Sequence, residues 1–285
     1  MEIEQIINKI DMLKPISSVG NRVMEIMYDP KSSMRDIVDV IQYDQSMTAN
    51  VLKICNSSYY GFRQKISSIQ QAVSLLGMEK IASMIVLGNS AGNFTAAQSG
   101  YDLAEGELWR YSVASALIAQ DIAEKKHFPN ISLLFTSALL KDIGKVVLNT
   151  YIKDSFEHII TLMEKNSYSF IEAEKEIIGI DHAELGAIIA EKWDFNPEMV
   201  NIIRNHHDPN KATTDNMSIP VVYLADSICM MIGIGVGSDG LSYRYHQEVI
   251  DRLRITDIDL QMIIADFWEK LKSVEELVNL SGGKN

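Results

Sequence analysis

Apolar residues recur at intervals of three and four along almost the whole chain, which is the spacing of half-buried helices. In 34–41, for example, Ile37, Val38 and Ile41 fall on one face, and Ser33 stands before the segment as a candidate N-cap. No segment shows a convincing alternation of apolar and polar residues with a period of two, as a half-buried strand requires. The pattern therefore predicts an all-α fold in which short loops join consecutive helices.

Capping residues also predict helix boundaries in residues 46–92. Ser46 is expected to cap one helix, and Ser68 opens another that ends at Gly77, where glycine adopts a left-handed C-cap at little cost. A strongly apolar helix follows at 78–92. The pair meeting at Gly77 could be a helix-turn-helix, but its second helix has Lys80 as its only cation, whereas a DNA-reading helix needs polar or cationic side chains. We therefore expect two packed core helices.

The polar, small-residue stretch 93–103 is the best candidate for an internal boundary. It divides the chain into an N-terminal helical half, 1–95, and a second helical half, 104–280, which is followed by a flexible tail at 281–285. No internal repeat is evident. Helices of the second half are expected at about 104–126, 131–141, 154–165, 168–178, 182–193, 197–207, 217–233, 244–252 and 256–279, with a flexible loop at 235–240.

Composition narrows the classes of function. The 285 residues are 47% hydrophobic and 22% charged, as in ordinary globular proteins. A net charge of −12 and 26 scattered lysines and arginines argue against nucleic acids and anionic membrane surfaces as partners. No apolar run reaches the ~18–20 residues that cross a bilayer, and the acidic N-terminus lacks the cationic start of a signal peptide. A cytoplasmic location is therefore expected by default. Cys55 and Cys229 lie far apart in apolar stretches, so we expect two free, buried thiols.

Polar motifs containing aspartate and histidine punctuate the second half. They are Leu-Trp-Arg-Tyr-Ser (108–112), Leu-Leu-Lys-Asp-Ile-Gly-Lys (139–145), Gly-Ile-Asp-His-Ala-Glu-Leu-Gly (179–186), Asn-His-His-Asp-Pro (205–209) and Leu-Ala-Asp-Ser (224–227). In this order, and with these flanks, they resemble the HD superfamily of metal-dependent phosphohydrolases. They resemble more closely its HDOD branch, whose members are usually described as signalling output modules.

Motifs of the first half support the same resemblance. Lys14-Pro15, the long segment 42–61 and the segment 66–77 look like HDOD sequences, so the resemblance runs from about residue 13 to 230. It implies a helical N-terminal bundle packed on a C-terminal HD-like helical domain.

The resemblance also assigns metal ligands. In the catalytic families two cations are bridged by a carboxylate, and Asp142 matches that bridge. One cation would take Asp226 and the family's first two histidine positions, and the other would take His182, His206 and His207. Two such cations polarise a phosphoryl group and activate water.

The first cation has lost both of its histidines. Tyr111 and Lys141 stand at those positions, and with Asp226 they define what we call the relic pocket. A phenol with a pKa of ~10 is a poor ligand at neutral pH, and an ammonium group has no lone pair to donate. Lys141 could instead supply the positive charge of the missing metal and pair with Asp142 or Asp226.

The second set is complete. Asp142, His182, His206 and His207 could hold one divalent transition metal, Fe, Mn, Ni or Zn, through one oxygen and three nitrogens. Each also has a structural explanation. Asp142 could stabilise a turn, and His182 could be a first-turn residue behind the N-cap Asp181. The two adjacent histidines could simply end a helix, where the helix dipole favours them.

Three histidines, His127, His158 and His246, fall outside the motifs and are expected in surface or packing roles. Glycine-rich phosphate loops and nucleophile elbows are missing from the sequence. The HD-GYP branch, which hydrolyses cyclic dinucleotides, continues after its double histidine with a glutamate and a Gly-Tyr-Pro element. This chain continues with Asp208-Pro-Asn-Lys instead, which argues against that activity.

These observations favour a non-catalytic HDOD signalling module that acts on regulatory protein partners in bacterial signal transduction. Two alternatives remain open: a metal-dependent phosphohydrolase working with one cation, and a sensor that binds a small anionic ligand in the relic pocket. The aromatic cluster 59–62 could form part of a partner surface, although core packing explains it as well.

Overall fold

The structure is a computed structural model that describes residues 3–13, 18–29, 31–42, 45–56, 60–212, 216–235, 237–238, 240 and 246–281. Within these ranges the chain is helical and contains no β-strand, which confirms the all-α prediction. The helices of the first half are α1 (Ile3–Asn8), α2 (Ser18–Tyr28), α3 (Met34–Ile41), α4 (Gln45–Cys55), α5 (Ile69–Leu76) and α6 (Met78–Phe94), with a 3-10 turn, η1, at Lys9–Met12. Those of the second half are α7 (Glu107–Lys126), α8 (Ile131–Leu140), α9 (Ile143–Asn166), α10 (Phe170–Ile178), α11 (His182–Lys192), α12 (Pro197–Asn205), α13 (Ser218–Met231), α14 (Gln247–Leu253) and α15 (Asp257–Ser281), with 3-10 turns η2 at Ser99–Tyr101 and η3 at Pro209–Lys211.

Local sequence accounts for the boundaries of the first helices. The Ser68 hydroxyl accepts a hydrogen bond from the Gln71 amide at 3.2 Å, as an N-cap should. Gly77 ends α5 with a φ of 82°, but its ψ of 162° is extended, so the expected left-handed cap is wrong in detail. The positive φ serves a sharp corner instead, since α5 and α6 are bent by 118° there. α4 begins at Gln45, one residue before the expected cap Ser46.

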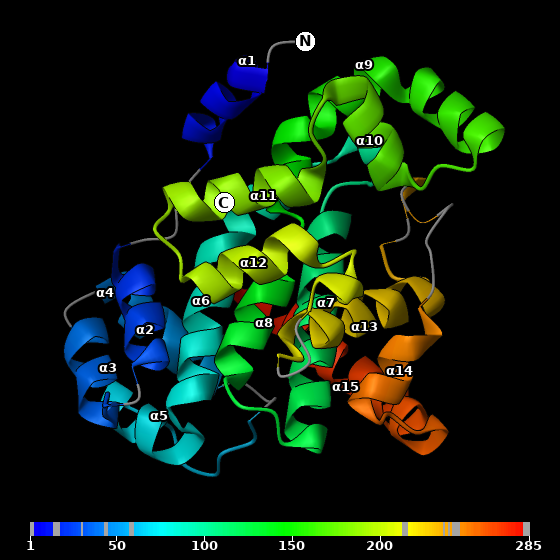
Figure 1. Ribbon diagram of the computed structural model, residues 1–285. Helices are drawn as coiled ribbons and strands as arrows, with labels where there is room; N and C mark the ends of the chain where they lie inside the picture. Colours follow the sequence, from blue (N-terminus) through cyan, green and yellow to red (C-terminus); the bar gives the residue numbers. More distant parts are fainter. Residues whose placement is uncertain are drawn as a thin grey trace.

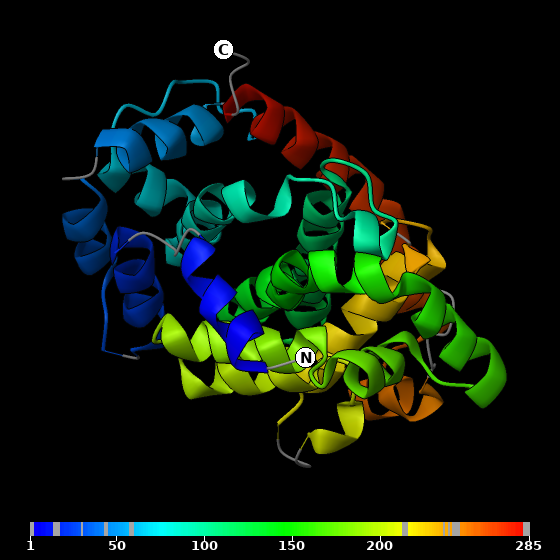
Figure 2. The same cartoon turned by 90° about the horizontal axis from the view of Figure 1, so that it is seen from above.

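The buried apolar residues form two separate cores. The smaller core lies among α2–α6, and the larger one fills the second half of the chain; the two groups of helices lie side by side in both views (Figures 1 and 2). Helix α6 belongs to both, with Ile81 and Ile85 in the smaller core and Val86 and Phe94 in the larger.

The division of the chain at residue 95 stays a prediction. The first residues of the chain, α1 and η1, nevertheless pack against the second half. Ile6 of α1 and Ile10 of η1 are fully buried in the larger core, so α1 packs near α11 rather than within the N-terminal bundle (Figure 1). Of the tail at 281–285, only Ser281 is described, as the end of α15. Lys14, Pro15 and residues 236 and 239 of the loop 235–240 lie outside the described residues.

The apolar face of α6 is committed to packing. Ile81, Ala82, Met84 and Ile85 are buried, so these side chains pack in the protein and are not available to read DNA bases. In the described part of the chain no single helix has the length and apolar composition to cross a membrane, and the bent pair α5–α6 meets that test only when both helices are taken together. Both cysteines are buried and free, as expected.

The largest difference from the predicted helices lies at the start of α9. We expected this helix from residue 154, but it begins at Ile143, almost directly after α8. The two helices are separated only by Lys141 and Asp142, and Asp142 has a φ of −95° and a ψ of 11°, which breaks the helical path. The Asp142 side chain makes no capping hydrogen bond to the backbone, so it does not act as an N-cap of α9. Every other helix of the second half ends within a few residues of its prediction.

Candidate metal centre

The motif residues are carried by different helices that converge in the larger core. Tyr111 lies on α7, Lys141 and Asp142 between α8 and α9, His182 at the start of α11, His206 and His207 just after α12, and Asp226 within α13. All seven are buried except His207, which is partly exposed. One donor atom from each of Asp142, His182, His206 and His207 lies within 4.8 Å of the others. These four residues could therefore hold a metal ion together, as the sequence suggested.

His206 has the clearest signature of a ligand. Its Nδ1 lies 2.7 Å from the carbonyl oxygen of Ile203, so Nδ1 carries the proton and Nε2 bears a lone pair. Nε2 is buried, has no hydrogen-bond partner in the described chain, and lies 3.9 Å from Asp142 Oδ1. A buried acceptor without a donor is costly. A cation between these two atoms would satisfy it, so this site fits a metal.

His182 is held in place by a carboxylate that the sequence analysis missed. Its Nδ1 lies 2.6 Å from Glu174 Oε2, and its backbone N–H donates to the same oxygen at 3.1 Å. The other Glu174 oxygen accepts from the Tyr101 hydroxyl at 2.5 Å. The Nε2 of His182 is thereby aimed at the centre, 3.6 Å from Asp142 Oδ1 and 2.9 Å from the Nε2 of His207. A carboxylate behind a histidine is a typical support of metal ligands.

Lys145 is the second residue that the sequence analysis missed. Its Nζ lies 2.8 Å from Asp142 Oδ1, and the side chain is almost fully buried. The spacing of three residues from Asp142 could have indicated this contact, had α9 been predicted to start at Ile143. No comparable signal marks Glu174, because it lies on a different helix from its partner Tyr101.

The relic pocket is filled by an ion pair rather than left open. Lys141 Nζ contacts Asp142 Oδ2 and lies 2.6 Å from Asp226 Oδ1. The Tyr111 hydroxyl donates to the same Asp226 oxygen at 2.5 Å, and its ring centroid lies 4.3 Å from Lys141 Nζ. Lys141 therefore pairs with both carboxylates that the sequence named, which the non-helical backbone at Asp142 makes possible.

Burial and pairing fix the charges of these groups. Burial opposes the charged form of Lys141, but Asp142 and Asp226 more than offset it and raise the pKa of this lysine. Burial also opposes the charged form of Asp142, but Lys141 and Lys145 hold its pKa well below the usual range. Burial lowers the pKa of His206 to about 3 and depresses that of His207 strongly. Both imidazoles are therefore neutral at pH 7 and offer lone pairs.

His182 differs from the other two histidines. Burial pulls its pKa down, but the charge and hydrogen bond of Glu174 outweigh burial and raise it. A protonated His182 would donate to the Nε2 of His207. Binding of a cation at this nitrogen would displace that proton.

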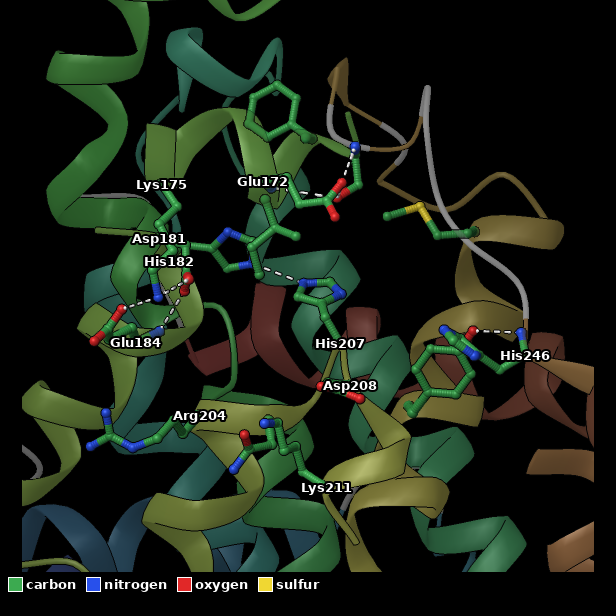
Figure 3. Close-up of a pocket in the computed structure, with 16 residues that line it drawn as sticks. Glu172, Lys175, Asp181, His182, Glu184, Arg204, His207, Asp208, Lys211 and His246 are labelled. Carbon is green, nitrogen blue, oxygen red and sulfur yellow. Dashed lines mark hydrogen bonds and ion pairs between the residues drawn. The ribbon is translucent and has the colours of Figure 1, made fainter. Parts of the chain in front are cut away.

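A cavity of about 560 Å³ leads to the centre, and His182 and His207 lie on its wall (Figure 3). Lys175, Arg204 and Lys211 line it together with acidic residues, so its mouth has mixed charge. Those acidic residues are Glu172, Asp181, Glu184 and Asp208.

Lys141 does not line this cavity, so an anionic ligand in it would not touch that residue. Of the three remaining histidines, His127 is the left-handed C-cap of α7 and His158 is exposed on α9. His246 lines the cavity. The sequence motifs gave no reason to expect it there.

Comparison with known proteins decides the family. A sequence model of the HDOD domain matches residues 13–209, which is more than half of the chain. The chain belongs to the HDOD domain family. The HDOD match covers the four candidate ligands and Lys141, and stops before Asp226.

Individual relatives are distant. A protein of Treponema pallidum (strain Nichols) is 22% identical over 204 residues, which cover 71% of this chain and 39% of that protein. The protein YuxH of Bacillus subtilis (strain 168) is 25% identical over 153 residues, which cover 51% of this chain and 36% of YuxH. This HDOD chain therefore spans less than half the length of the curated relatives it matches.

Solved structures share the fold over nearly the whole chain. An HDOD domain protein of unknown function from Geobacter sulfurreducens is 24% identical, with a TM-score of 0.71 and coverage of 99% of both chains. A candidate signal transduction protein from Marinobacter aquaeolei VT8 is 20% identical, with a TM-score of 0.73 and coverage of 99% of this chain and 62% of that one. A candidate phosphohydrolase from Shewanella amazonensis SB2B is 20% identical, with a TM-score of 0.61 and coverage of 95% and 94%. The helical HDOD fold is thus confirmed.

Proposed function

We propose that this chain is a regulatory HDOD module that binds one divalent transition metal and acts through contacts with a protein partner rather than through catalysis. The observation that carries the proposal is the position of Lys141. Its Nζ lies between Asp142 and Asp226, where the resemblance would place the first of two cations. A second metal ion could bind only if the Lys141 ammonium group moved out of this position, because that group has no lone pair and repels a cation.

The second cation position supports binding of one metal. His206 Nε2 is buried without a partner, and Glu174 orients His182 from behind. One carboxylate oxygen and three imidazole nitrogens suit Fe, Mn, Ni or Zn. A bound ion there would supply Lewis acidity and would tie α9, α11 and α12 together through their ligands.

Positive charge near the centre argues against hydrolysis. Lys141 and Lys145 both contact Asp142. Their ammonium groups partly neutralise this carboxylate, so it is a weaker bridge for two metal cations. Regulation through a protein partner is the function that such a scaffold can retain, and one structure of the same fold is described as a candidate signal transduction protein.

The test is elemental analysis of untagged protein purified without chelators, beside the His206→Ala variant. We expect about one transition metal per wild-type chain and essentially none in the variant, because loss of one of four ligands weakens binding strongly. About two metals per chain would contradict the role given to Lys141. No metal in either protein would contradict the mononuclear site and leave a metal-free interaction module.

The second candidate function is phosphoester hydrolysis with one cation. It is favoured by the cavity of about 560 Å³ that gives access to His182 and His207 (Figure 3). Protein loaded with Mn²⁺ can be assayed against bis(p-nitrophenyl) phosphate. Turnover that His206→Ala abolishes, in protein with one metal per chain, would favour the enzyme over the regulatory module.

A further inference from the structure

A second cavity, of about 460 Å³, lies between helix α2 of the first half and the α11–α12 region of the second half. One wall is the outer face of α2, and the other is the turn between α11 and α12 with the first residues of α12. Both views place this turn beside α2 (Figures 1 and 2). None of the motifs of the metal centre contributes to it.

The walls of this cavity combine aromatic rings with carboxylates. Tyr28, Trp193 and Phe195 supply the rings, and the last two contact each other edge to face with centroids 5.8 Å apart. Asp194 projects from the turn between them, where its φ of 58° marks a left-handed backbone. Aromatic faces attract cations, and a planar guanidinium both stacks on rings and pairs with carboxylates.

The charge of the cavity is one-sided. Glu25, Asp29 and Asp194 line it, and no lysine, arginine or histidine is among its described lining residues. The Glu25 carboxylate is paired with Arg22 on the same helix, so Asp29 and Asp194 supply the charge that is open to a ligand. Burial raises the pKa of the Tyr28 phenol, and the nearby Glu198 carboxylate raises it further, as expected in a negative field. Asn21 adds a buried Oδ1 that has no hydrogen-bond partner in the described chain and therefore lacks a donor.

We infer that this cavity between α2 and the α11–α12 turn is a docking site for an arginine side chain of a partner protein. The guanidinium would lie against the rings of Trp193 and Tyr28 and pair with Asp194 and Asp29. Its N–H groups would find acceptors in the Asp29 and Asp194 carboxylates and in the buried Asn21 Oδ1. Because α12 begins at this cavity and ends beside His206, the site lies on an element that also carries the metal centre.

The experiment uses the whole chain labelled with 5-fluorotryptophan and the probe peptide acetyl-Ala-Arg-Ala-amide. The chain has three tryptophans, so the resonance of Trp193 can be assigned with Trp193→Phe. We expect the probe to shift the Trp193 resonance saturably and to leave those of Trp109 and Trp268 in place. The same peptide with citrulline, which is neutral and of the same shape, should bind roughly tenfold more weakly or not at all.

Paired variants separate the cavity from general electrostatic attraction to an acidic protein. Asp29→Asn with Asp194→Asn removes two charges, and asparagine tolerates the left-handed backbone at position 194. We expect this double variant to weaken the probe roughly tenfold or more, while Asp154→Asn with Glu157→Gln on exposed α9 positions leaves binding unchanged.

Unchanged positions of the Trp109 and Trp268 resonances would show that the variants are folded. Equal binding of the citrulline peptide, equal loss in both double variants, or no shift of Trp193 at millimolar probe would overturn the inference. His206→Ala should bind the probe as wild type does, so this result does not depend on whether the metal site exists.

Discussion

Lys141 is a fully buried lysine that contacts two buried carboxylates, and its removal tests how the centre is held together. In chelator-treated protein, Lys141→Met removes the ammonium group that lies between Asp142 and Asp226, while Lys145 still contacts Asp142. We expect a loss of about 3–5 kcal/mol in the free energy of unfolding, measured by urea denaturation. Lys153→Met, on an exposed position of α9, should change it by no more than about 0.5 kcal/mol. Equal stability of Lys141→Met and wild type would show that the lysine does not replace a missing metal.

Restoring the family's histidines tests the same site in the opposite direction. Tyr111→His with Lys141→His removes the ammonium group and places two imidazoles beside Asp226 and Asp142. We expect elemental analysis to rise from about one to about two transition metals per chain, because neutral imidazoles are good ligands for these ions. A variant that is folded, by circular dichroism, and still holds one metal would show that other features of the pocket exclude the second ion.

The low pKa of His206 gives the metal-free protein a specific acid sensitivity. Burial lowers this pKa to about 3, whereas the pKa of a histidine in the unfolded chain is near its ordinary value of 6.5. Between these values the unfolded chain binds a proton that the folded chain does not, so stability falls as pH decreases from about 6.5 toward 3.

We predict that His206→Asn, which keeps a donor for the Ile203 carbonyl, shows a shallower dependence. Between pH 4 and 6 its slope of unfolding free energy against pH should be smaller by about 1 kcal/mol per pH unit. The facing groups Asp142 and His182 are the same in both proteins, so their contributions largely cancel. Identical slopes would mean that His206 is protonated in the folded protein.

At the scale of helices, the close approach of α9 to α11 depends on one glycine. A Cβ at Gly144 would lie 2.1 Å from the His182 carbonyl oxygen, and that oxygen belongs to the backbone of α11. Gly144→Ala must therefore separate the two helices that carry Asp142 and His182. We expect a loss of about 1–3 kcal/mol or more in unfolding free energy, together with reduced metal content.

Gly88 provides the matched control. A Cβ there meets nothing within 4 Å, and the residue lies within α6. Gly88→Ala should stabilise the protein by about 0.5–1 kcal/mol, since alanine is the better helix former. If both alanine variants have wild-type stability and metal content, α9 and α11 can separate at position 144 with little cost in free energy.

The same elements show what a sequence can and cannot predict. Periodicity and capping residues predicted the helices because their faces are decided locally, as at Ser68. The start of α9 was missed because the charged residues Lys141, Asp142 and Lys145 interrupt the apolar pattern. These residues form buried ion pairs at the candidate metal centre. The four candidate ligands came from motif order alone. Glu174 could not be found this way, because its contact with His182 depends on how α10 turns back onto α11.

On the scale of the whole molecule, the two cores are joined mainly through α6, which packs against α7–α9 as well as against α2, α4 and α5. All candidate ligands lie in the larger core, and none lies among α3–α5. Regions with separate cores can open separately, each with its own free energy. A ligand that binds only the folded larger core should then protect that core and leave the smaller one unchanged.

Hydrogen exchange with and without Mn²⁺ tests this directly. At a concentration of 100 times the dissociation constant, binding stabilises the folded site by about 2.7 kcal/mol, which corresponds to roughly hundredfold slower exchange of amides that open with it. We expect this slowing in the first turns of α9 and in α11 and α12, and little change in α3–α5. His206→Asn should abolish the effect of Mn²⁺. Equal protection of α3–α5 would show that the halves open as one unit, in which case metal occupancy at the centre stabilises the N-terminal bundle as well.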